Sequence, residues 1–351
     1  MAYDADVLVV GGGPAGLASA LHAARAGLTV AVCEQRTGPV DKACGEGIMP
    51  AGVERLRALG VRPEGAALTG IDYLDLSGRR AHAPFLRGSG LGLRRTELQE
   101  VLAAAAKAAG AQLLHRRITT LEQDAVSVTA GGLRVRWLVA ADGLHSPLRR
   151  HLGVQAHHGG LRRFGVRRHW YVRPWTSAVE VTWGPHAEAY VTPVAADQVG
   201  VAVLYRPERA PAAAAQHTYE ALLSGFPALR RRLAEAAAAS SVRGAGPMPQ
   251  RPERRVVGRV LLVGDSAGYE DALTGEGISL ALAQAQTAVD ALLSGAPHRY
   301  ERQWHRTTRR YRLLTQGLVR ATTRPAPRAL LVPACRAVPA LFTGVVNQLA
   351  R

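Results

Sequence analysis

Two hydrophobic periodicities alternate along this chain of 351 residues. A short apolar run at 6–10 leads into glycines, an apolar-periodic helix is predicted over 15–26, and a second apolar run follows at 29–33. The same pairing of strand and helix returns later, with helices over 94–109 and 277–293 and strands over 137–141 and 256–263. Strands that alternate with helices predict an α/β domain of the Rossmann type.

A second pattern interrupts this domain. Partly alternating stretches divided by turn residues predict an inserted antiparallel β-sheet, with strands near 162–172, 178–184, 188–193 and 199–205. The Gly- and Pro-rich residues 244–254 are typical of a linker that returns to the first domain. We expect a discontinuous first domain, a second domain and a C-terminal helical segment, over 1–75 with 94–155 and 255–298, over 76–93 with 156–254, and over 299–351.

The composition is that of a globular protein, with 47% hydrophobic and 20% charged residues. The formal net charge is +17, and Lys42 and Lys107 are the only lysines among the basic residues. The arginines are scattered, without interleaved aromatics or zinc-ligand spacing, so we expect neither a nucleic-acid partner nor a metal. Three cysteines, no apolar run of about 18 residues and no basic leader favour a cytoplasmic protein without a transmembrane helix. No pattern indicates an oligomeric state.

A glycine loop between the first strand and helix carries the strongest local signal. Gly11 permits a tight turn, Gly13 allows the backbone to approach a pyrophosphate, and Gly16 allows close helix–strand packing. Pro14 and Ala15 open the helix, whose N-terminus favours phosphate. Eighteen residues beyond this loop, Glu34 ends the second strand, where it can accept hydrogen bonds from the ribose hydroxyls of an adenosine. Together these features predict dinucleotide binding.

Distant segments favour a flavin over a nicotinamide as the resident dinucleotide. Asp142 lies in an Asp-Gly turn after the strand 137–141, and Asp265 follows a later strand, where it can bind ribitol or phosphate. The helix that begins at Gly277 directs its N–H groups and dipole at whatever lies there. Reduced flavin is anionic along its N1–C2=O2 edge, and such a helix end stabilises an anion.

With these residues, the sequence resembles the flavoprotein superfamily of p-hydroxybenzoate hydroxylase and geranylgeranyl reductase. The resemblance extends to about residue 300 and rests on 6–16, Arg95–Leu98, Ala140–Gly143, Gly264–Gly268 and Thr274–Ile278. It implies a Rossmann-type FAD-binding domain with an inserted antiparallel β-sheet substrate domain and C-terminal helices.

The resemblance also implies individual contacts to FAD. Arg95 and Asp142 would bind the cofactor, and Asp265 would hold its ribitol or pyrophosphate. Gly275 belongs to the same motif as Gly277 and Ile278, whose backbone would meet the pyrimidine edge of the flavin. Ile118, expected on the strand after the Arg95 helix, would meet the adenine. The alternative for Arg95 is a solvated helix start.

A Cys-Gly segment adds a candidate for chemistry. The geranylgeranyl reductase branch has a similar segment beside the flavin, as have bacterial monooxygenases of polyketide and phenolic products, which implies that Cys44 and Gly45 lie near the isoalloxazine. Cys44 is the candidate catalytic residue, and the alternative is a small buried filler. Glu188–Pro193 stands where those reductases have their Tyr-x-Trp-x-Phe-Pro substrate motif, and the tryptophan-and-proline signature of flavin halogenases is absent.

No second G-x-G-x-x-G marks a nicotinamide domain, so NAD(P)H is expected to bind only transiently as reductant. We expect a monooxygenase that oxidises a hydrophobic aromatic or polyketide-like molecule through a C4a-hydroperoxyflavin. Reduction of prenyl-lipid double bonds and a non-enzymatic flavin scaffold stay open. His82 and His169 are candidate bases for a phenol, against surface or core roles.

The C-terminal segment is basic and partly apolar. Prolines at 325, 327, 333 and 339 are expected to break its helices, and the basic residues are Arg309, Arg310, Arg312, Arg320, Arg324, Arg328 and Arg336. Apolar stretches such as Ala329–Pro333 lie between them. Such a segment can lie on an anionic membrane, or it can simply cap the substrate cavity.

Overall fold

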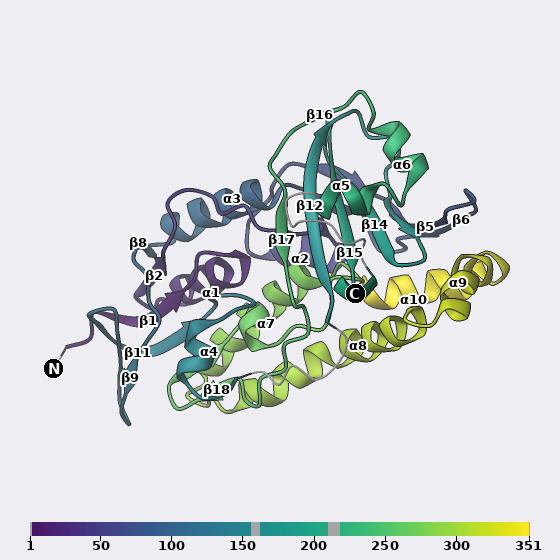
Figure 1. Ribbon diagram of the computed structural model, residues 1–351. Helices are drawn as coiled ribbons and strands as arrows, with labels where there is room; N and C mark the ends of the chain where they lie inside the picture. The colour runs from purple at the N-terminus through teal and green to yellow at the C-terminus, as the bar shows by residue number, and fades with distance from the viewer. Residues whose placement is uncertain (1, 156–161, 210–217, 351) are drawn as a thin grey trace.

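A computed structural model describes residues 2–155, 162–209 and 218–350 (Figure 1). The first sheet has the order β18-β19-β11-β1-β2-β8, and β10 and β9 extend it from β11. Its core pairs, from β19 through β11, β1 and β2 to β8, are all parallel. The strands are β1 (Ala5–Val10), β2 (Val30–Glu34), β8 (Gln112–His115), β9 (Glu122–Gln123), β10 (Val128–Ala130), β11 (Leu133–Ala140), β18 (Val256–Val257) and β19 (Val260–Leu262).

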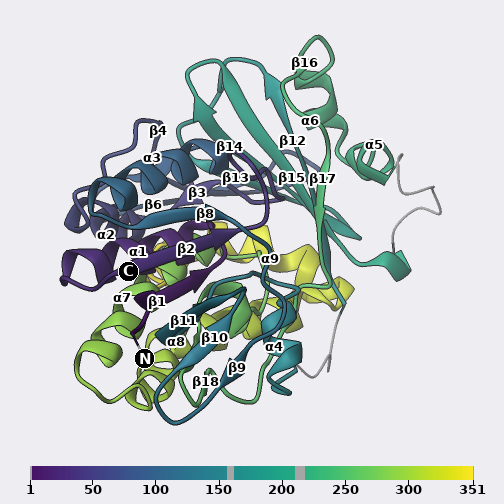
Figure 2. The ribbon, with the colours of Figure 1, turned by 90° about the vertical axis from the view of Figure 1, so that its left-hand side faces the viewer.

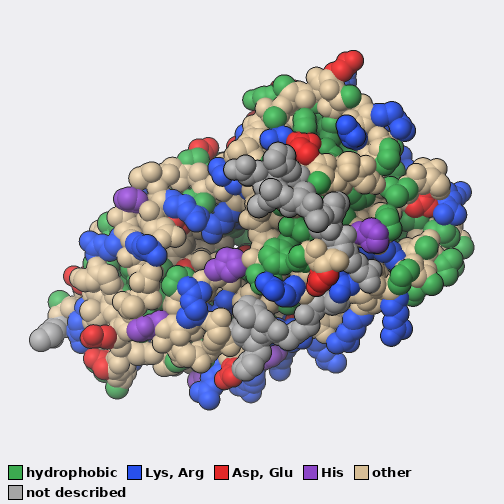
Figure 3. All heavy atoms as spheres, in the orientation of Figure 1, with side chains coloured by type: hydrophobic (Ala, Val, Ile, Leu, Met, Phe, Trp, Pro, Cys, Tyr) green, Lys and Arg blue, Asp and Glu red, His purple; other side chains and the backbone are tan. Residues whose placement is uncertain are grey.

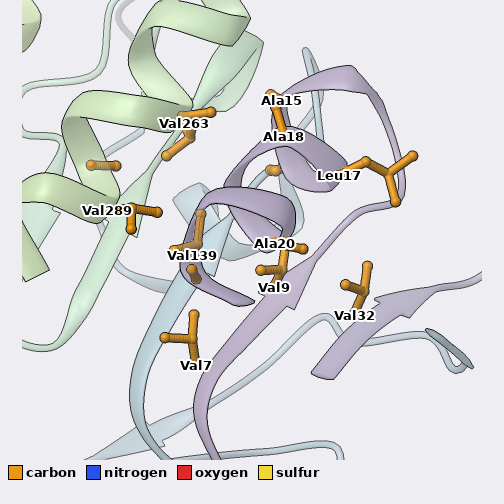
Figure 4. Close-up of a cluster of buried hydrophobic side chains, with 14 of the residues drawn as sticks. Val7, Val9, Ala15, Leu17, Ala18, Ala20, Val32, Val139, Val263 and Val289 are labelled. Carbon is orange, nitrogen blue, oxygen red and sulfur yellow. The ribbon is translucent and has the colours of Figure 1, made fainter. Parts of the chain in front are cut away.

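Helices cover this sheet through small and branched apolar side chains. Figure 4 shows Val9, Val32 and Val139, from three neighbouring strands, beneath α1. All three valines are at most 1% exposed, and each contributes about 1.5–3 kcal/mol by its burial. The helix α1 packs against both α3 and α7. The helices of this domain are α1 (Pro14–Arg25), α2 (Pro50–Ala58), α3 (Arg95–Ala108), α4 (Pro147–His151) and α7 (Gly277–Leu293), with the short η3 (Gly264–Ala267).

The second sheet has the order β16-β12-β15-β14-β13-β5-β6, with β17 added to β12. It is antiparallel except for the parallel pair β5–β13. The predicted inserted sheet is confirmed. Its strands are β5 (Gly70–Asp75), β6 (Arg80–Pro84), β12 (Phe164–Tyr171), β13 (Val179–Trp183), β14 (Ala187–Ala195), β15 (Gln198–Tyr205), β16 (Ala237–Ala238) and β17 (Arg243–Ala245).

Both faces of the second sheet are covered, which explains why β14 is buried along nearly its whole length. Successive side chains point to opposite faces, so Val191 packs with Leu222 on one side while Tyr190 packs with Phe342 on the other. The first side is covered by α5 (Thr218–Leu223) and α6 (Pro227–Arg232), preceded by η1 (Pro207–Arg209). The second is covered by α9 (Pro325–Ala337) and α10 (Pro339–Leu349), which follow the long α8 (Arg299–Thr322). Figure 1 shows α8, α9 and α10 below the second sheet, with α5 and α6 at its upper right, and Figure 2 shows α5 and α6 beside this sheet in the view turned by 90°.

Several expected boundaries differ from the structure. The strand β5 pairs with β13, so the sheet favours a domain boundary before Gly70 rather than after residue 75. The predicted strand 256–263 is two antiparallel strands that turn at Gly258. The predicted linker starts inside the second sheet, because β17 reaches Ala245. A small three-stranded sheet of β3 (Gly47–Ile48), β4 (Ala66–Leu68) and β7 (Gly90–Gly92) was not predicted.

The C-terminal prolines break fewer helices than expected. Pro325 and Pro339 each occupy the first turn of a helix, where the missing N–H costs nothing. The expected breaks at Pro327 and Pro333 are wrong, since both residues lie within α9. Among the described helices none alone has the length and apolar composition of a membrane span, and only the pair α9 and α10, bent by 104°, passes that test together.

Candidate active site

The glycine loop has the close approaches that its sequence predicts. Gly11 has a φ of 111°, and a Cβ there would lie 2.3 Å from the Ala141 oxygen. A Cβ on Gly16 would lie 1.9 Å from the Gly11 oxygen, so only glycine allows the helix to start this near the strand. Gly13 is the N-cap of α1 and makes no side-chain cap, while Pro14 is the first helical residue. The N-terminus of α1 thus retains donors for a phosphate.

Glu34 lies beside this loop, as expected for a residue at the end of β2. Its Oε2 accepts a hydrogen bond from the Gly12 N–H at 2.8 Å, and its Oε1 accepts from the Arg36 N–H at 3.1 Å. The carboxylate therefore fixes the loop whatever else it binds. Its contact with a ribose stays a prediction.

A cluster of charges surrounds an open cleft next to the loop. The Arg95 guanidinium lies over Gly13, since a Cβ there would be 3.3 Å from Nη2. Asp265 is exposed, yet burial raises the pKa of its carboxyl, and Arg95 and Lys42 lower it. The Asp265 side chain is thus surrounded by protein atoms yet accessible, in a cleft that it lines together with Gly277. These positions agree with the predicted roles of Arg95 and Asp265 and argue against a merely solvated Arg95.

Lys42 belongs to the same cluster but escaped prediction. Burial lowers the pKa of its ammonium group, and Arg95 and Arg36 lower it further. Its Nζ would lie 3.5 Å from a Cβ on Gly143, next to the Asp-Gly turn. The signal for Lys42 in the sequence was its residue type, since it is one of only two lysines in an arginine-rich chain. Because Arg95 and Lys42 are near Asp265 and the loop of α1, they can hold an anionic pyrophosphate.

Ile118 and Asp142, two residues predicted to contact FAD, have surroundings that differ from those expected. Ile118 is not on a strand, because β8 ends at His115, and it is buried in the following loop with 6% exposure. Asp142 is partly buried, and its Oδ2 accepts from the Leu148 N–H at 3.0 Å, which ties the turn to α4. Asp142 thus has a structural partner, and its contact with FAD stays a prediction.

The N-terminus of α7 closes the far end of the cleft. Gly275 has a φ of 69°, and a Cβ there would lie 3.0 Å from Met49 Cε. Gly277 is the first residue of the helix, and Ile278 behind it is buried. Between them Glu276 is buried, with Oε2 free of any hydrogen-bond partner in the described part of the chain. Burial raises the pKa of Glu276 to about 8, so this carboxyl is neutral at pH 7.

The Cys44 side chain packs at the edge of the first core, and Gly45 beside it is exposed. The Glu46 N–H donates to Cys44 Sγ at 3.4 Å. Burial raises the pKa of the Cys44 thiol, and the Glu46 carboxylate raises it further. Cys44 therefore keeps its proton at neutral pH, and it is a weak nucleophile.

Two side chains of β12 hold the segment that carries Cys44. Arg167 and His169 are two residues apart, so they point to the same face of the strand. Arg167 donates to Asp41 and to the Lys42 carbonyl, at 2.8 Å for the latter. His169 Nε2 lies 2.5 Å from Glu46 Oε2. We call these two residues the β12 clamp, because they join the second sheet to residues 41–46.

Hydrogen-bond accounting assigns the protons within the β12 clamp. His169 Nδ1 lies 3.0 Å from Arg167 Nη1, and a guanidinium can only donate. Nδ1 therefore accepts from Arg167, with Ser240 Oγ also 2.9 Å away, and the Nε2 N–H donates to the Glu46 carboxylate. The other Glu46 oxygen accepts from the Arg95 N–H at 3.0 Å, at the start of α3. Glu46 thereby links the Cys44 segment, α3 and β12.

Glu46 is also conformationally unusual. It is the one non-glycine residue with positive φ, 59°, in the described backbone. Such strain persists where surrounding contacts fix it, and it concentrates at functional sites. Glu46 was not predicted as a site residue, although its position between Gly45 and Gly47 was a signal for unusual backbone.

The segment that replaces the reductases' substrate motif is partly closed by ion pairs. Glu188 is bound by two buried arginines, Arg163 at 2.9 Å and Arg328 at 2.6 Å. Tyr190 donates from its hydroxyl to the Leu273 carbonyl at 3.2 Å, just before the Gly275 turn. Glu188 and Tyr190 thus support the loop that precedes α7.

A cavity lies behind this loop, between α7 and α8. One wall contains Asp265 and Gly277, which are predicted cofactor residues, together with Gly264. The other contains Trp304, Tyr311 and Arg312 of α8. The cofactor residues thus line a hollow from several distant parts of the chain.

Comparison with known proteins identifies the family. The family described as FAD binding domain matches residues 4–296. The chain belongs to this family. It is an FAD-dependent flavoprotein oxidoreductase, and the resemblance to the superfamily of p-hydroxybenzoate hydroxylase and geranylgeranyl reductase is confirmed.

Relatives of this flavoprotein include two kinds of reductase. The "Menaquinone reductase" of Mycobacterium tuberculosis is 32% identical over 321 residues, which cover 82% of this chain and 76% of that protein. "Digeranylgeranylglycerophospholipid reductase 1" of Methanopyrus kandleri is 28% identical over 298 residues, 79% of this chain and 77% of that protein. Among solved structures, a triple mutant of the flavin-dependent brominase Bmp2 has a TM-score of 0.82 at 18% identity, over 99% of this chain and 94% of that one. That likeness shows the fold alone.

Proposed function

We propose that this flavoprotein is an FAD-dependent reductase of a hydrophobic substrate of the quinone or prenyl-lipid class. The observation that carries the proposal is the position of the Cys44 thiol at the Cys-Gly segment, where its Sγ accepts from the Glu46 N–H at 3.4 Å and burial raises its pKa. Reducing a double bond requires a hydride and a proton on the substrate. Reduced FAD supplies the hydride when bound, and Cys44 holds a proton at Sγ. Two relatives named as reductases, each matched over about four fifths of the chain, support the same class.

The cleft residues fit FAD by their chemistry. The glycine loop leaves no room for side chains where the pyrophosphate would approach, and Arg95 and Lys42 supply positive charge. The N-terminus of α7 would face the flavin with its N–H groups. The β12 clamp fixes residues 41–46, which include Lys42 and Cys44. NAD(P)H is proposed as the transient reductant, bound in the same cleft.

Neither histidine considered as a base suits phenol hydroxylation. His169 is fully buried, and both ring nitrogens are engaged within the β12 clamp. His82 lies on β6 and pairs with Asp72 at 2.8 Å, at the far side of the second sheet. A monooxygenase that depends on such a base is therefore less well supported than a reductase.

Monooxygenation of an aromatic or polyketide-like molecule is the second candidate. It is favoured by the sequence of Glu188–Pro193, which differs from the substrate motif of the reductases. Glu188 forms ion pairs with Arg163 and Arg328, so it does not line a prenyl-lipid site.

The two candidates differ in what the substrate gains. The holoenzyme, reduced without oxygen, is mixed with a menaquinone or a prenylated lipid, and the product is weighed by mass spectrometry. The proposal expects a gain of hydrogen in the absence of oxygen, lost in Cys44→Ala when rates are normalised to bound flavin. Turnover that requires oxygen and adds an oxygen atom to the product would overturn it in favour of the second candidate.

A further inference from the structure

The outer side of the C-terminal helix pair is apolar. Leu330 on α9 is 62% exposed, Leu341 on α10 is 66% exposed, and Val338 between the helices is 51% exposed. The inner sides of the same helices are buried through Val332 and Phe342. These helices therefore have two apolar sides, and only the inner one has a partner in the described chain. We call the outer side, with Leu330, Val338, Leu341 and Val345, the apolar corner.

Basic residues flank the apolar corner. Residues 302–351 contain ten arginines and not one aspartate or glutamate. Seven of them are exposed within the described residues, Arg302, Arg306, Arg309, Arg310, Arg320, Arg324 and Arg336. Figure 3 shows Lys and Arg side chains along the edge over α8 and hydrophobic ones at the end over α9 and α10.

The structure removes two arginines from this surface. Arg328 is buried against Glu188, and Arg312 pairs with Glu270 at 3.1 Å. Both had been counted among the basic residues of the segment. The surface charge that is left lies on the exposed side of α8 and at both ends of α9. Its position beside the apolar corner is therefore a property of the fold and not of composition alone.

We propose that α8, α9 and α10 dock this protein on the surface of an anionic lipid bilayer. Exposed leucine and valine gain free energy by entering the headgroup region, and exposed arginines such as Arg324 and Arg336, at the two ends of α9, attract anionic lipids. Because the inner sides of α9 and α10 are packed in the core, the helices lie along the surface rather than across it. Val338 lies at the bend of 104° between the two helices.

Charge and shape argue against two other occupants. A second copy of the chain in a two-fold contact would bring a matching set of arginines against these, with no acidic residue in 302–351 to pair with them. A nucleic acid would satisfy the arginines but would leave Leu330 and Leu341 in water. A membrane satisfies both features at once.

The docking surface lies next to the substrate side of the fold. Phe342, on the inner side of α10, contacts Tyr73 at 4.7 Å between ring centroids, and the same cluster contains Tyr190 and Leu273. A bilayer on the apolar corner would thus lie one helix layer from the loop that precedes α7. The docking inference stands without the proposed reductase activity, and the test below uses no turnover.

The test is co-sedimentation of the holoenzyme with vesicles of phosphatidylcholine alone and of phosphatidylcholine mixed with phosphatidylglycerol, at low and high salt. Binding is expected to the anionic vesicles only and to fall with salt. Leu330→Asp with Leu341→Asp, and separately Arg306→Glu with Arg309→Glu, are each expected to lower partitioning more than tenfold, since one charge is worth about fivefold. Point substitutions are used because truncation would uncover Tyr73 and Trp183.

Two control variants make the same kinds of substitution away from the apolar corner. Val126→Asp changes an exposed apolar residue (51%) of the first domain, and Arg57→Glu with Arg117→Glu changes the net charge equally away from α8. Both controls should sediment like the parent protein. The proposal is overturned if the parent stays in solution with anionic vesicles at low salt, or if the controls lose binding as much as the test variants. A concentration-dependent dimer lost in the leucine variant would also overturn it, in favour of a second copy.

Discussion

The imidazole of His169 on β12 donates to the carboxylate of Glu46, 123 positions earlier in the chain, across 2.5 Å. Neither side chain is more than 1% exposed. This contact joins the second sheet to the segment of Cys44, so it makes the geometry of the cleft depend on both sheets. Its removal should therefore affect the flavin as well as the free energy of unfolding.

His169→Ala is expected to lower the free energy of unfolding by about 1–3 kcal/mol, because Glu46 would keep a buried carboxylate with one partner fewer. It is also expected to shift the flavin reduction potential, which a purely structural histidine would leave unchanged. The matched control is His82→Ala, since that ring pairs with Asp72 at 2.8 Å but is 45% exposed. His82→Ala should lower the free energy of unfolding by less than about 1 kcal/mol and leave the flavin reduction potential unchanged. Equal effects in the two variants would contradict the positioning role of the β12 clamp.

Glu34→Ala should weaken FAD by about 1–3 kcal/mol, the size of a lost charge-assisted hydrogen bond. The substitution removes two interactions, because Glu34 accepts a hydrogen bond from the Gly12 N–H and is placed to accept another from the adenosine ribose. Titration of apoprotein with FAD measures the change, and Glu122→Ala, an exposed residue of β9, is the control. Release of stoichiometric FMN from the purified protein would refute the assignment, because FMN has no adenosine.

Gly277→Val should reduce flavin occupancy or alter the reduction potential, because a branched side chain would stand where backbone approaches the flavin. Gly295 is unsuited as a control, since its φ of 66° would strain a valine. Gly317 serves instead, because a Cβ there meets nothing within 4 Å. If Gly277→Val and Gly317→Val leave the flavin spectrum and potential alike, α7 does not face the cofactor.

Cys44→Ser should retain FAD yet slow turnover per bound flavin, if the thiol faces the substrate. Cys335→Ser, on α9, is the control for loss of a thiol elsewhere. The raised pKa of Cys44 also predicts slow alkylation by iodoacetamide at pH 8, with a rate that rises as the solution becomes more alkaline. A change confined to the melting temperature, with normal flavin-based rates, would show that Cys44 only fills space.

Glu276 should make stability depend on pH. Its folded-state pKa of about 8 lies above the ordinary carboxyl value of 4.5, so its contribution is complete below pH 4.5 and is lost as the pH rises through 8. Glu276→Gln cannot ionise, so its stability relative to the parent should grow between pH 5 and pH 8, by on the order of 3 kcal/mol. Denaturant unfolding at fixed FAD measures this, with exposed Glu54→Gln as control. A difference that is constant over this range would exclude a buried, neutral Glu276.

Local patterns predicted the glycine loop, the alternation of strands and helices in the first domain and the N-terminus of α7, because each depends on residues close in sequence. Glu46 and Arg167 were missed because their partners lie across the two sheets, and Lys42 was missed because the residues around it, Arg95 and Asp265, are distant in sequence. Arg328 was mispredicted for the same reason, because its position depends on a partner distant in the sequence. A basic residue in a basic segment was predicted to be at the surface, but its partner Glu188 lies 140 positions away and draws it into the core.

The pairing of distant strands also constrains how the chain can fold during synthesis. β5 pairs with β13, and β11 pairs with β19. In each pair the second strand is synthesised over a hundred residues after the first, so the first strand stays unpaired on that side until then. The second sheet can be completed only after residue 245 has left the ribosome and the first only after residue 262, so both keep open edges through most of translation. Folding one domain at a time is not available to this protein, and chaperone protection of the nascent strands is the expected requirement for its production.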